Sequence, residues 1–352
     1  MRRIYSDVIQ FRGSHYEFGL IQGRQIKDSL ILKNREKIWK IRSPRFAIDE
    51  QETKKMLERF APGIWEEIEG LKDVLELPME MILRNFGGYR IPAERSGCSI
   101  VTGKEFLVRN YDFHPKTYEG RFSLFQPTDK GYATIGPAQR ITGRMDGMNE
   151  KGLAMGYNSI NRKEPGPGFV CWMIGRMILE NCATAEETID FLKEIPHRHT
   201  FSYVVLDPNE ETYIIETSPR KIAVRKSNAC TNHHEAIPEE NRKYLADSKQ
   251  RLDTIQKNTN ENMSAYAAFR MMNDTDKNVF SKEYKSWAGT IHTSVYFPKE
   301  KRAWMVLGGD QEPVKFNFER WLEGEDQQID RIYGEVDTEI GFAHMDSKLN
   351  KF

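Results

Sequence analysis

The chain has 352 residues, of which 39% are apolar, and its 52 basic side chains balance its 52 acidic ones. This length suits one large domain or two ordinary ones, and it can bury a sizeable core without disulfide or metal staples. A net charge of zero gives no basic field for nucleic acid or an anionic membrane, and no apolar run approaches the roughly 20 residues of a membrane-spanning helix. We therefore expect neither a nucleic-acid partner nor a membrane partner.

The N-terminus and the cysteines indicate the compartment. The first 13 residues, MRRIYSDVIQFRG, contain two arginines with no apolar stretch after them, which argues against a secretory signal. The four cysteines are widely spaced and form no C-x-x-C pair, which argues against a disulfide scaffold and a cysteine-based zinc site. We expect a soluble cytoplasmic protein in which Cys171, Cys182 and Cys230 are buried core residues.

The first 90 residues are predicted to be helical. Ser14 and Glu17 have the spacing of a capping box and open a helix that continues to about Leu30. A second helix is predicted over 51–75, because apolar residues recur there with nearly helical period, and a short third helix over 80–86.

The pattern changes to strand pairs after residue 96. Hairpins are predicted at 99–108 and at 144–157. The later elements are predicted in this order: helices at 170–181 and 185–195, strands at 203–206, 213–216 and 222–225, helices at 239–255 and 264–272, and strands at 290–297 and 303–307. Strand pairs with short turns make antiparallel sheets, and the helices come in groups between them, so the sequence indicates an α+β fold.

A cysteine stands where the helix-rich segment gives way to the first hairpin, in the sequence Gly97-Cys98-Ser99. The return strand of this hairpin ends in RNYD, so it can bring Arg109 and Asp112 back beside Cys98. A guanidinium near sulfur favours the thiolate, which is the reactive form. Taken alone, a single cysteine is more often a small buried apolar residue, and an Arg-Asn-x-Asp strand end is more often a surface ion pair.

Further motifs follow in a fixed order along the chain. They are 13–19 with Gln22-Gly23, 62–70, 97–99, 109–112, 148–153 with Asn158, 231–233, 248–251 and 290–296. As a set they resemble the acyl-coenzyme A:6-aminopenicillanic acid acyltransferase family, which are cysteine-type N-terminal-nucleophile hydrolases related to penicillin V acylase and bile salt hydrolase. The resemblance implies a four-layer αββα sandwich, in which two antiparallel sheets lie between helical layers.

The resemblance also implies a precursor that cuts itself between Gly97 and Cys98. Residues 1–97 would remain as an α chain and residues 98–352 as a β chain that carries the nucleophile, together one globular unit. Glycine leaves the attacked carbonyl open. The freed α-amine of Cys98, with an ordinary pKa of roughly 7.7–8.0, can act as the base for the adjacent thiol. Asp112 is expected to hold the α-ammonium, and Arg109 to contact the sulfur and the acyl end of the substrate.

Two asparagines and two further residues receive roles from the same resemblance. Asn232 is expected to donate in the oxyanion hole and Asn158 to bind the tetrahedral intermediate, since an amide donates a hydrogen bond without titrating. Arg251 is expected to brace the site and His233 to line the cleft. Without the resemblance, turn chemistry is the commoner reason for an asparagine at a strand end.

The resulting hypothesis is acyl transfer from a linear amide through an S-acyl-Cys98 intermediate. The substrate would be a small-molecule amide or an acyl thioester. Water would be the default acyl acceptor, and a thiol or an amine the alternative acceptor. No cofactor is expected, and a homo-oligomer is left open. Two other functions are retained: an uncleaved, inactive binding or structural protein, and a metal-dependent amidohydrolase. His197 and His199 would supply two zinc ligands in the latter, but no third ligand stands near them, so no metal site is predicted.

Overall fold

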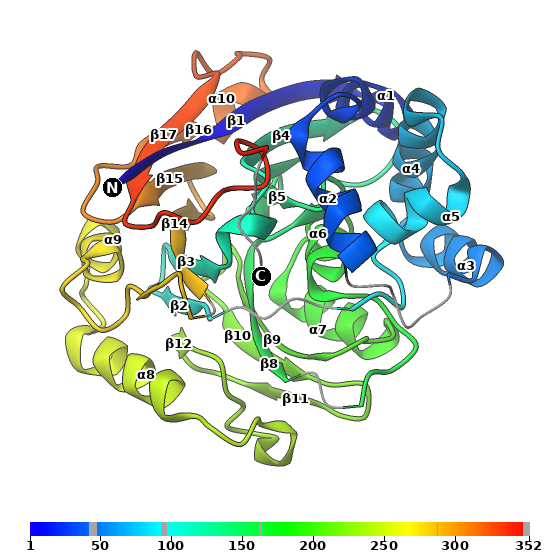
Figure 1. Ribbon diagram of the computed structural model, residues 1–352. Coiled ribbons are helices and arrows are strands. Elements are labelled where there is room, and N and C mark those ends of the chain that lie inside the picture. Colours follow the sequence, from blue (N-terminus) through cyan, green and yellow to red (C-terminus); the bar gives the residue numbers. More distant parts are fainter. Residues whose placement is uncertain (42–47, 93–96, 162–163, 287, 348–352) are drawn as a thin grey trace.

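The computed structural model of the chain describes residues 1–41, 48–92, 97–161, 164–286 and 288–347, and its elements are shown in Figure 1. The helices are α1 (His15–Ile26), α2 (Leu30–Ile41), α3 (Glu50–Phe60), α4 (Pro62–Leu75), α5 (Met79–Ile82), α6 (Cys171–Asn181), α7 (Ala185–Glu194), α8 (Ala246–Asn258), α9 (Ala265–Asn273) and α10 (Phe318–Leu322). The strands up to the middle of the chain are β1 (Arg2–Gly13), β2 (Ser99–Thr102), β3 (Leu107–Phe113), β4 (Arg121–Pro127), β5 (Thr134–Gln139), β6 (Gly143–Arg144), β7 (Asp146–Asn149) and β8 (Ala154–Asn161). The later strands are β9 (Thr200–Leu206), β10 (Thr212–Thr217), β11 (Ile222–Arg225), β12 (Ala229–Cys230), β13 (Lys282–Glu283), β14 (Ala288–Phe297), β15 (Arg302–Gly308), β16 (Val314–Asn317) and β17 (Arg331–Val336).

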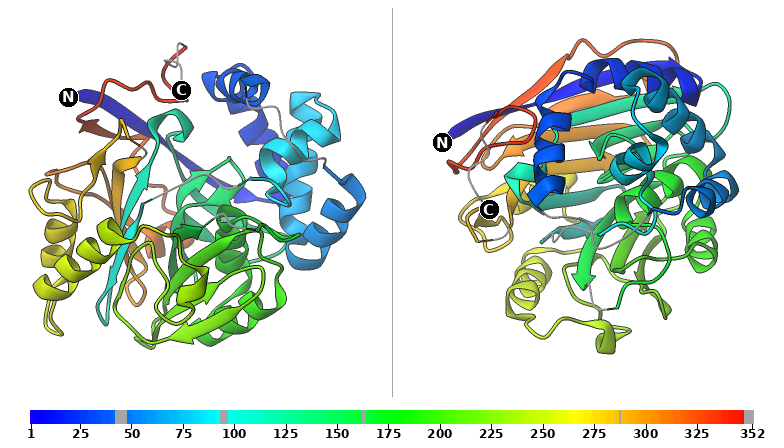
Figure 2. Two further views of the ribbon diagram at one scale, coloured as in Figure 1. Left: turned by 60° about the horizontal axis from the view of Figure 1, so that its bottom comes forward. Right: turned by 45° about the vertical axis from the view of Figure 1, so that its right-hand side comes forward.

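The strands form two sheets that share one edge. The first sheet pairs β1, β4, β5, β7, β8, β9, β10 and β11 in that order, and the second pairs β16, β15, β14, β3, β2 and β12. Strand β17 pairs with both β1 and β15, and so connects the two sheets. The pairs β1–β4 and β15–β17 are parallel, while the other pairs in this path are antiparallel. Figure 2 shows the two sheets stacked between groups of helices.

Side chains alternate between two different cores along the central strands. On β8 and β9, Met155 and Val205 belong to the apolar core under α6 and α7, while Ala154 and Val204 belong to the core between the sheets. This alternation is what a strand buried on both faces requires. A third core, which includes Phe269, fills the space between the second sheet and the helices α8 and α9.

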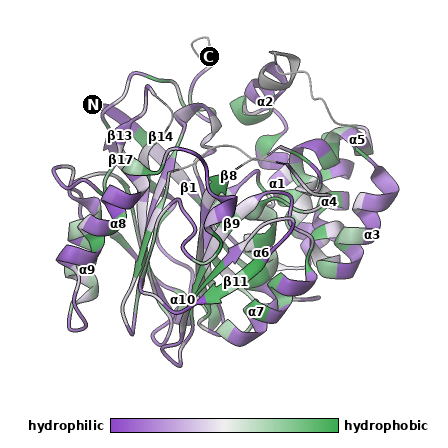
Figure 3. Cartoon of the chain, turned by 90° about the horizontal axis from the view of Figure 1, so that it is seen from below, coloured by the Kyte–Doolittle hydropathy of each residue, from purple (hydrophilic) through white to green (hydrophobic). Residues whose placement is uncertain are grey.

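Three apolar cores separate four layers, so the predicted α+β fold with an αββα arrangement is confirmed. Helix α6 is buried along nearly its whole length, and Figure 3 shows it as largely hydrophobic. Within the described ranges, no helix is both long and apolar enough to span a membrane.

At the start of the chain, the structure differs from the helix predicted from the sequence. Residues 2–13 form the strand β1, which lies between β4 and β17, and are not helical. Most of its side chains are only partly buried, and their polarity conceals the period of a strand. The capping box that follows is as predicted: the Ser14 hydroxyl accepts from the Glu17 backbone N–H, and the Glu17 carboxylate accepts from the Ser14 N–H.

Four predicted helices have different boundaries. The helix expected to continue to about Leu30 ends at Ile26, and α2 begins at Leu30. The segment 51–75 forms two helices, α3 and α4, because Pro62 lacks an N–H and begins the second one. The segment 80–86 is divided between α5 and a π-helical turn over Leu83–Gly87. The helix expected over 239–255 begins only at Ala246.

Glycines let the N-terminal helices approach each other closely. A Cβ on Gly19 of α1 would lie 2.1 Å from the Glu67 carbonyl oxygen, and one on Gly70 of α4 would lie 2.2 Å from the Tyr16 carbonyl oxygen. Helices α1 and α4 therefore pack backbone to backbone beside α6 (Figure 1).

Candidate active site

The hairpin β2–β3 sets the position of Cys98, which immediately precedes β2. The Gly97 N–H donates to the Asp112 carbonyl oxygen at 3.1 Å, and the register places Ile100 opposite Arg109. Residues two apart on a strand share a face, and so do directly opposed residues on neighbouring strands. Arg109 therefore lies on the same face as the fully buried Cys98 side chain.

The Arg109 guanidinium lies against the sulfur. Its Nη2 donates to Cys98 Sγ at 3.2 Å and to the Tyr157 carbonyl oxygen at 2.6 Å. A Cβ on Gly156 would lie 2.8 Å from Arg109 Cδ, so glycine at this position makes room for the arginine between the sheets. Burial opposes the charge, but Cys98 and Asp146 raise the pKa of Arg109, which therefore presents a permanent positive charge to the thiol.

Asp112 reaches the Gly97–Cys98 junction from the other face of β3. Its Oδ1 accepts a hydrogen bond from Thr290 Oγ1 at 2.6 Å, and its Oδ2 is buried with no hydrogen-bond partner in the described part of the chain. Burial raises the pKa of Asp112 to about 7, although Arg251 and Thr290 act in the opposite direction. A buried carboxylate oxygen without a partner is suited to a cationic group formed beside it.

Strand β12 places Asn232 beside Cys98, because β12 pairs with β2 and brings Cys230 opposite Ile100. Arg251 of α8 connects the two positions. Its Nη1 donates to the Cys98 carbonyl oxygen at 2.9 Å, and its Nη2 donates to Asn232 Oδ1 at 2.9 Å. These bonds fix the orientation of the Asn232 amide, whose Nδ2 donates to the Ser159 carbonyl oxygen at 2.7 Å.

Asn158 and His233 complete the predicted set. Asn158 Nδ2 donates to the carbonyl oxygens of Cys230 and Thr231 at 3.0 and 3.3 Å, which ties β8 to β12. Its Oδ1 is buried and has no partner among the described residues. His233 Nδ1 lies 2.8 Å from Ser248 Oγ, so its ring braces α8, and burial lowers its pKa.

One buried carboxylate in this site, that of Asp146, was not predicted from the sequence. Asp146 of β7 accepts from Arg109 Nη1 at 2.6 Å and from three side chains of β14, namely His292, Ser294 and Tyr296. Asp146 itself stands in no pattern, but its partners do. Polar side chains occupy every second position from 292 to 296, which puts them on one face of a strand that is buried throughout.

The other cysteines and histidines have ordinary structural surroundings. Cys171, Cys182 and Cys230 are buried as predicted, and burial raises the pKa of Cys182 to about 12 and that of Cys230 to about 11. His197 Nε2 lies 2.8 Å from the Leu192 carbonyl oxygen, and burial lowers its pKa to about 4. Across the described ranges, no three His, Cys, Asp or Glu residues are grouped so that they could hold a metal ion.

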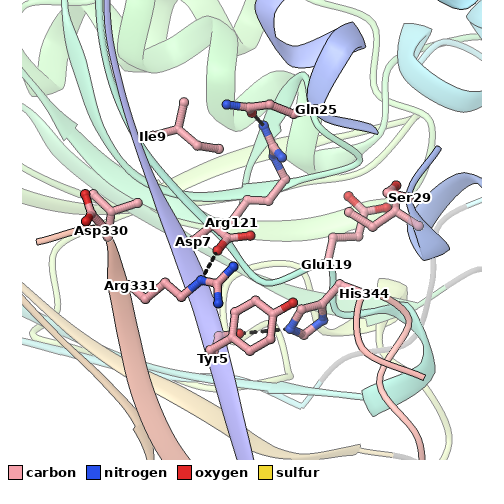
Figure 4. A pocket seen from close by; sticks show the side chains of 12 residues that line it. Tyr5, Asp7, Ile9, Gln25, Ser29, Glu119, Arg121, Asp330, Arg331 and His344 are labelled. Atoms are coloured by element: carbon pink, nitrogen blue, oxygen red, sulfur yellow. Dashed lines mark hydrogen bonds and ion pairs between the residues drawn. The ribbon is translucent and has the colours of Figure 1, made fainter. Parts of the chain in front are cut away.

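A separate cavity of about 450 Å³ opens between β1, the helices α1 and α2, and the C-terminal segment (Figure 4). It is lined by Tyr5, Asp7, Val8, Ile9, Gln25, Ser29, Ile31, Glu119, Arg121, Asp330, Arg331 and His344. Its two arginines are bonded to groups that also line it: Arg331 Nε donates to Asp7 Oδ1 at 2.7 Å, and Arg121 Nη2 donates to Gln25 Oε1 at 2.7 Å. The cavity joins residues before position 97 to residues after it, and Cys98 does not line it.

Comparison with known families identifies the class of protein to which this site belongs. Residues 101–312, more than half of the chain, match the family described as "Acyl-coenzyme A:6-aminopenicillanic acid acyl-transferase". The chain belongs to this family, as the motifs predicted. The matched span contains Arg109, Asp112, Asn158 and Asn232, and it begins three residues after Cys98.

The solved structures to which the chain is similar are distant in sequence. Penicillin V acylase from Agrobacterium tumefaciens is 16% identical, with a TM-score of 0.44 over 62% of this chain and 84% of that one. A mutant of the conjugated bile acid hydrolase from Clostridium perfringens is 14% identical, with a TM-score of 0.46 over 71% and 100%. The Caenorhabditis elegans ortholog of N-acylethanolamine-hydrolyzing acid amidase is 12% identical, with a TM-score of 0.40 over 58% and 93%. A search among curated proteins finds no match.

Proposed function

We propose that this chain is a self-processing cysteine N-terminal-nucleophile amidase or acyltransferase that acts on linear amide bonds. The observation that carries the proposal is the 3.2 Å contact between the buried Arg109 Nη2 and Cys98 Sγ, next to a glycine-cysteine junction. A permanent cation beside a thiol favours the thiolate. Family membership adds support, because the family is described as an acyltransferase.

Processing would begin with attack of the Cys98 sulfur on the Gly97 carbonyl carbon. The C–N bond of the junction breaks, the Cys98 nitrogen takes up a proton and becomes the α-amine, and Gly97 is left as a thioester on Cys98. Water then hydrolyses the thioester, which releases the Gly97 carboxylate and restores the thiol. The products are an α chain of residues 1–97 and a β chain of residues 98–352. Asp112 supports this assignment, because its backbone carbonyl oxygen accepts from the Gly97 N–H and its Oδ2 is buried without a hydrogen-bond partner in the described part of the chain.

Turnover would repeat this chemistry on a small-molecule amide. The α-amine of Cys98 takes the thiol proton, the sulfur attacks the amide carbonyl carbon, and the amine product leaves with that proton. Asn232 would donate its second amide N–H to the oxyanion of the tetrahedral intermediate, while Arg251 holds the Asn232 amide in orientation. Asn158 would bind the intermediate partly through its backbone. Water would normally accept the acyl group, and a thiol or amine acceptor would give transfer instead. No cofactor takes part in these steps.

Intact-mass measurement of the purified protein tests the proposal directly. Under denaturing conditions the wild type should give fragments of residues 1–97 and 98–352, which co-purify under native conditions. Cys98→Ala should remain one chain, whereas Cys171→Ala, which removes another buried cysteine, should still be cut. An unbroken wild-type chain that hydrolyses amides would contradict the proposal. An unbroken chain with no activity and no reactive thiol would favour the binding or structural alternative.

The same preparation tests whether an acceptor other than water can take the acyl group. Hydroxylamine added to a reaction with an accepted amide should divert the acyl group to a hydroxamate, which is detected by mass. Cys98→Ala should form none. Chelator treatment should leave the activity unchanged; loss of activity with a chelator, together with normal activity in Cys98→Ala, would identify a metal-dependent amidohydrolase.

A further inference from the structure

Asp146 is a fully buried carboxylate that bridges the two sheets. It belongs to β7 of the first sheet, and the groups that donate to it belong to β3 and β14 of the second. Oδ2 accepts from Arg109 Nη1 at 2.6 Å and lies 3.3 Å from His292 Nε2. Oδ1 accepts from Ser294 Oγ at 3.0 Å and from the Tyr296 hydroxyl.

This carboxylate is ionised in its buried position. Burial alone opposes ionisation, but the hydrogen bond from His292 and the charge of Arg109 hold the pKa of Asp146 well below its ordinary value. The titratable groups that face it are Arg109 from β3, His292 and Tyr296 from β14, and, at longer range, Tyr118 before β4. Burial lowers the pKa of His292 and raises those of both tyrosines. His292 and Tyr296 are hydrogen-bonded to the carboxylate, whereas Tyr118 interacts with it only at longer range.

We infer that Asp146 is a positioning residue for the proposed nucleophile: it holds the Arg109 guanidinium in the orientation that places Nη2 on Cys98 Sγ. The inference rests on the proposed function of Cys98. Asp146 does not touch the sulfur and acts through Arg109, because one fork of the guanidinium ends on Oδ2 and the other on Sγ. The Tyr157 carbonyl oxygen is the second anchor for Nη2, but it carries no charge to balance the arginine.

Loss of the Asp146 charge would leave Arg109 buried without a carboxylate partner. A buried cation without a counterion is strongly unfavourable, so the guanidinium would shift toward water or toward another acceptor. Either movement takes it from the sulfur. The thiol of Asp146→Asn should therefore ionise at higher pH than the wild-type thiol, in the same direction as in Arg109→Gln.

The pH profile of Cys98 alkylation by iodoacetamide, read by peptide mass spectrometry, tests this inference. In Asp146→Asn the midpoint should rise by roughly one pH unit or more. In Arg109→Gln it should rise at least as much, and the double variant should match Arg109→Gln alone, because the two residues act in series. Glu67→Gln is the matched control, because Glu67 also forms a fully buried pair with an arginine, Arg176, at 2.9 Å. Its midpoint should equal that of the wild type.

Two results would overturn the inference. One is an Asp146→Asn midpoint that is unchanged or lowered, which would mean that Asp146 only weakens the field of Arg109 at the sulfur. The other is an additive shift in the double variant. If Asp146→Asn does not fold, Tyr296→Phe can replace it, because this variant removes one donor from the carboxylate and keeps the charges of Asp146 and Arg109. The midpoint of its alkylation profile should rise by less than one pH unit. An unchanged midpoint would again overturn the inference. A wild-type Cys98 that is not alkylated at all would instead refute the proposed nucleophile.

Discussion

Two groups of buried charges can be compared within this molecule. The first, which we call the sulfur cluster, contains Cys98, Arg109 and Asp146 between the two sheets, together with Asp112 on the other face of β3. The second, which we call the helix cluster, joins α1, α4 and α6 and contains His15, Glu67, Arg176 and Glu180. Each is organised around one fully buried arginine.

The two arginines use their donors differently. All three nitrogens of Arg176 donate to oxygen atoms, those of Glu180, Thr142 and Glu67, and no atom of the helix cluster is buried without a partner among the described residues. Arg109 instead directs one nitrogen to sulfur. In and beside the sulfur cluster, Asp112 Oδ2 and Asn158 Oδ1 are buried and have no partner within the described ranges. Satisfied buried charge is typical of a structural network, whereas unsatisfied polar atoms around a thiol are typical of a site that awaits another group.

Among the predicted substitutions, removal of the arginine of the helix cluster should cause the largest change in the free energy of unfolding. Arg176→Met leaves Glu67 and Glu180 without their main counterion, so it should lower the free energy of unfolding by about 3–5 kcal/mol. Turnover per folded molecule should stay within about twofold of wild type, because this cluster does not contact the sulfur. Urea unfolding, together with active-site titration of Cys98, measures both quantities. A large fall in turnover with unchanged stability would show that the two clusters are not separate.

Asn232→Ala should affect turnover rather than stability. Loss of one oxyanion donor typically costs about 10²–10³ in kcat, with little change in substrate binding. The variant should fold and still be alkylated at Cys98. Asn149→Ala is the control, because the Asn149 amide also donates to backbone carbonyl oxygens, but to those of Leu179 and Cys182 at the C-terminal end of α6. If kcat holds while KM rises, Asn232 binds substrate and the oxyanion role is wrong.

The sequence allowed much of this architecture to be predicted, and particular residues explain the rest. Antiparallel pairs with short turns, such as β2–β3 and β14–β15, were predicted because local pattern determines them. Strand β1 was missed because its partners, β4 and β17, lie more than 100 residues away and its own residues are largely polar. Its position depends on tertiary pairing, which no local propensity contains.

The residues of the candidate site also fall into those that local geometry predicts and those that it does not. Arg109 and Asp112 belong to one hairpin with Cys98, so their approach to it follows from local geometry. Asn158, Asn232 and Arg251 were predicted only through the family resemblance, since they come from separate strands and a helix. Asp146 was missed because its contacts with β14 span about 150 residues, and a lone aspartate in a turn-rich segment carries no distinguishing pattern.

Asp112→Asn should have a smaller effect on turnover than Asn232→Ala. It removes a charge-assisted hydrogen bond to the proposed α-ammonium, worth roughly 1.5–3 kcal/mol, so processing or turnover should fall about 10- to 100-fold. Fragment yield by intact mass and kcat on an accepted amide measure the two steps. Normal values for both would show that Asp112 is only a structural carboxylate.

The pH dependence of the uncut chain tests Asp112 separately. Its pKa of about 7 in the folded chain is above the ordinary value, so between pH 4 and 7 the folded state binds a proton that the unfolded state does not. This contribution to stability is present below pH 4 and is lost as pH rises through 7. In a Cys98→Ala background, Asp112→Asn should abolish this fall in stability between pH 4 and 7. Identical pH–stability curves for the two proteins would contradict the burial of an ionisable Asp112.

Substitution of His15 should have the smallest effect on stability, and the pH dependence of that effect distinguishes the helix cluster from the sulfur cluster. Its Nδ1 lies 2.7 Å from Asp129 Oδ1 and its Nε2 lies 3.3 Å from Glu180 Oε1. Burial tends to lower the pKa of His15, but Glu180 outweighs burial and the pKa is raised. The stabilisation is therefore fully present below the unfolded pKa of about 6.5 and is lost as pH rises through the folded pKa. His15→Gln should lower stability by about 1 kcal/mol at pH 6 and by less at pH 9. Thermal unfolding across this range measures the difference, with Cys98 alkylation as the internal control. If the substitution instead shifts the alkylation profile and leaves the stability curve unchanged, the helix cluster is coupled to the sulfur, and the separation of a structural from a reactive charge network fails.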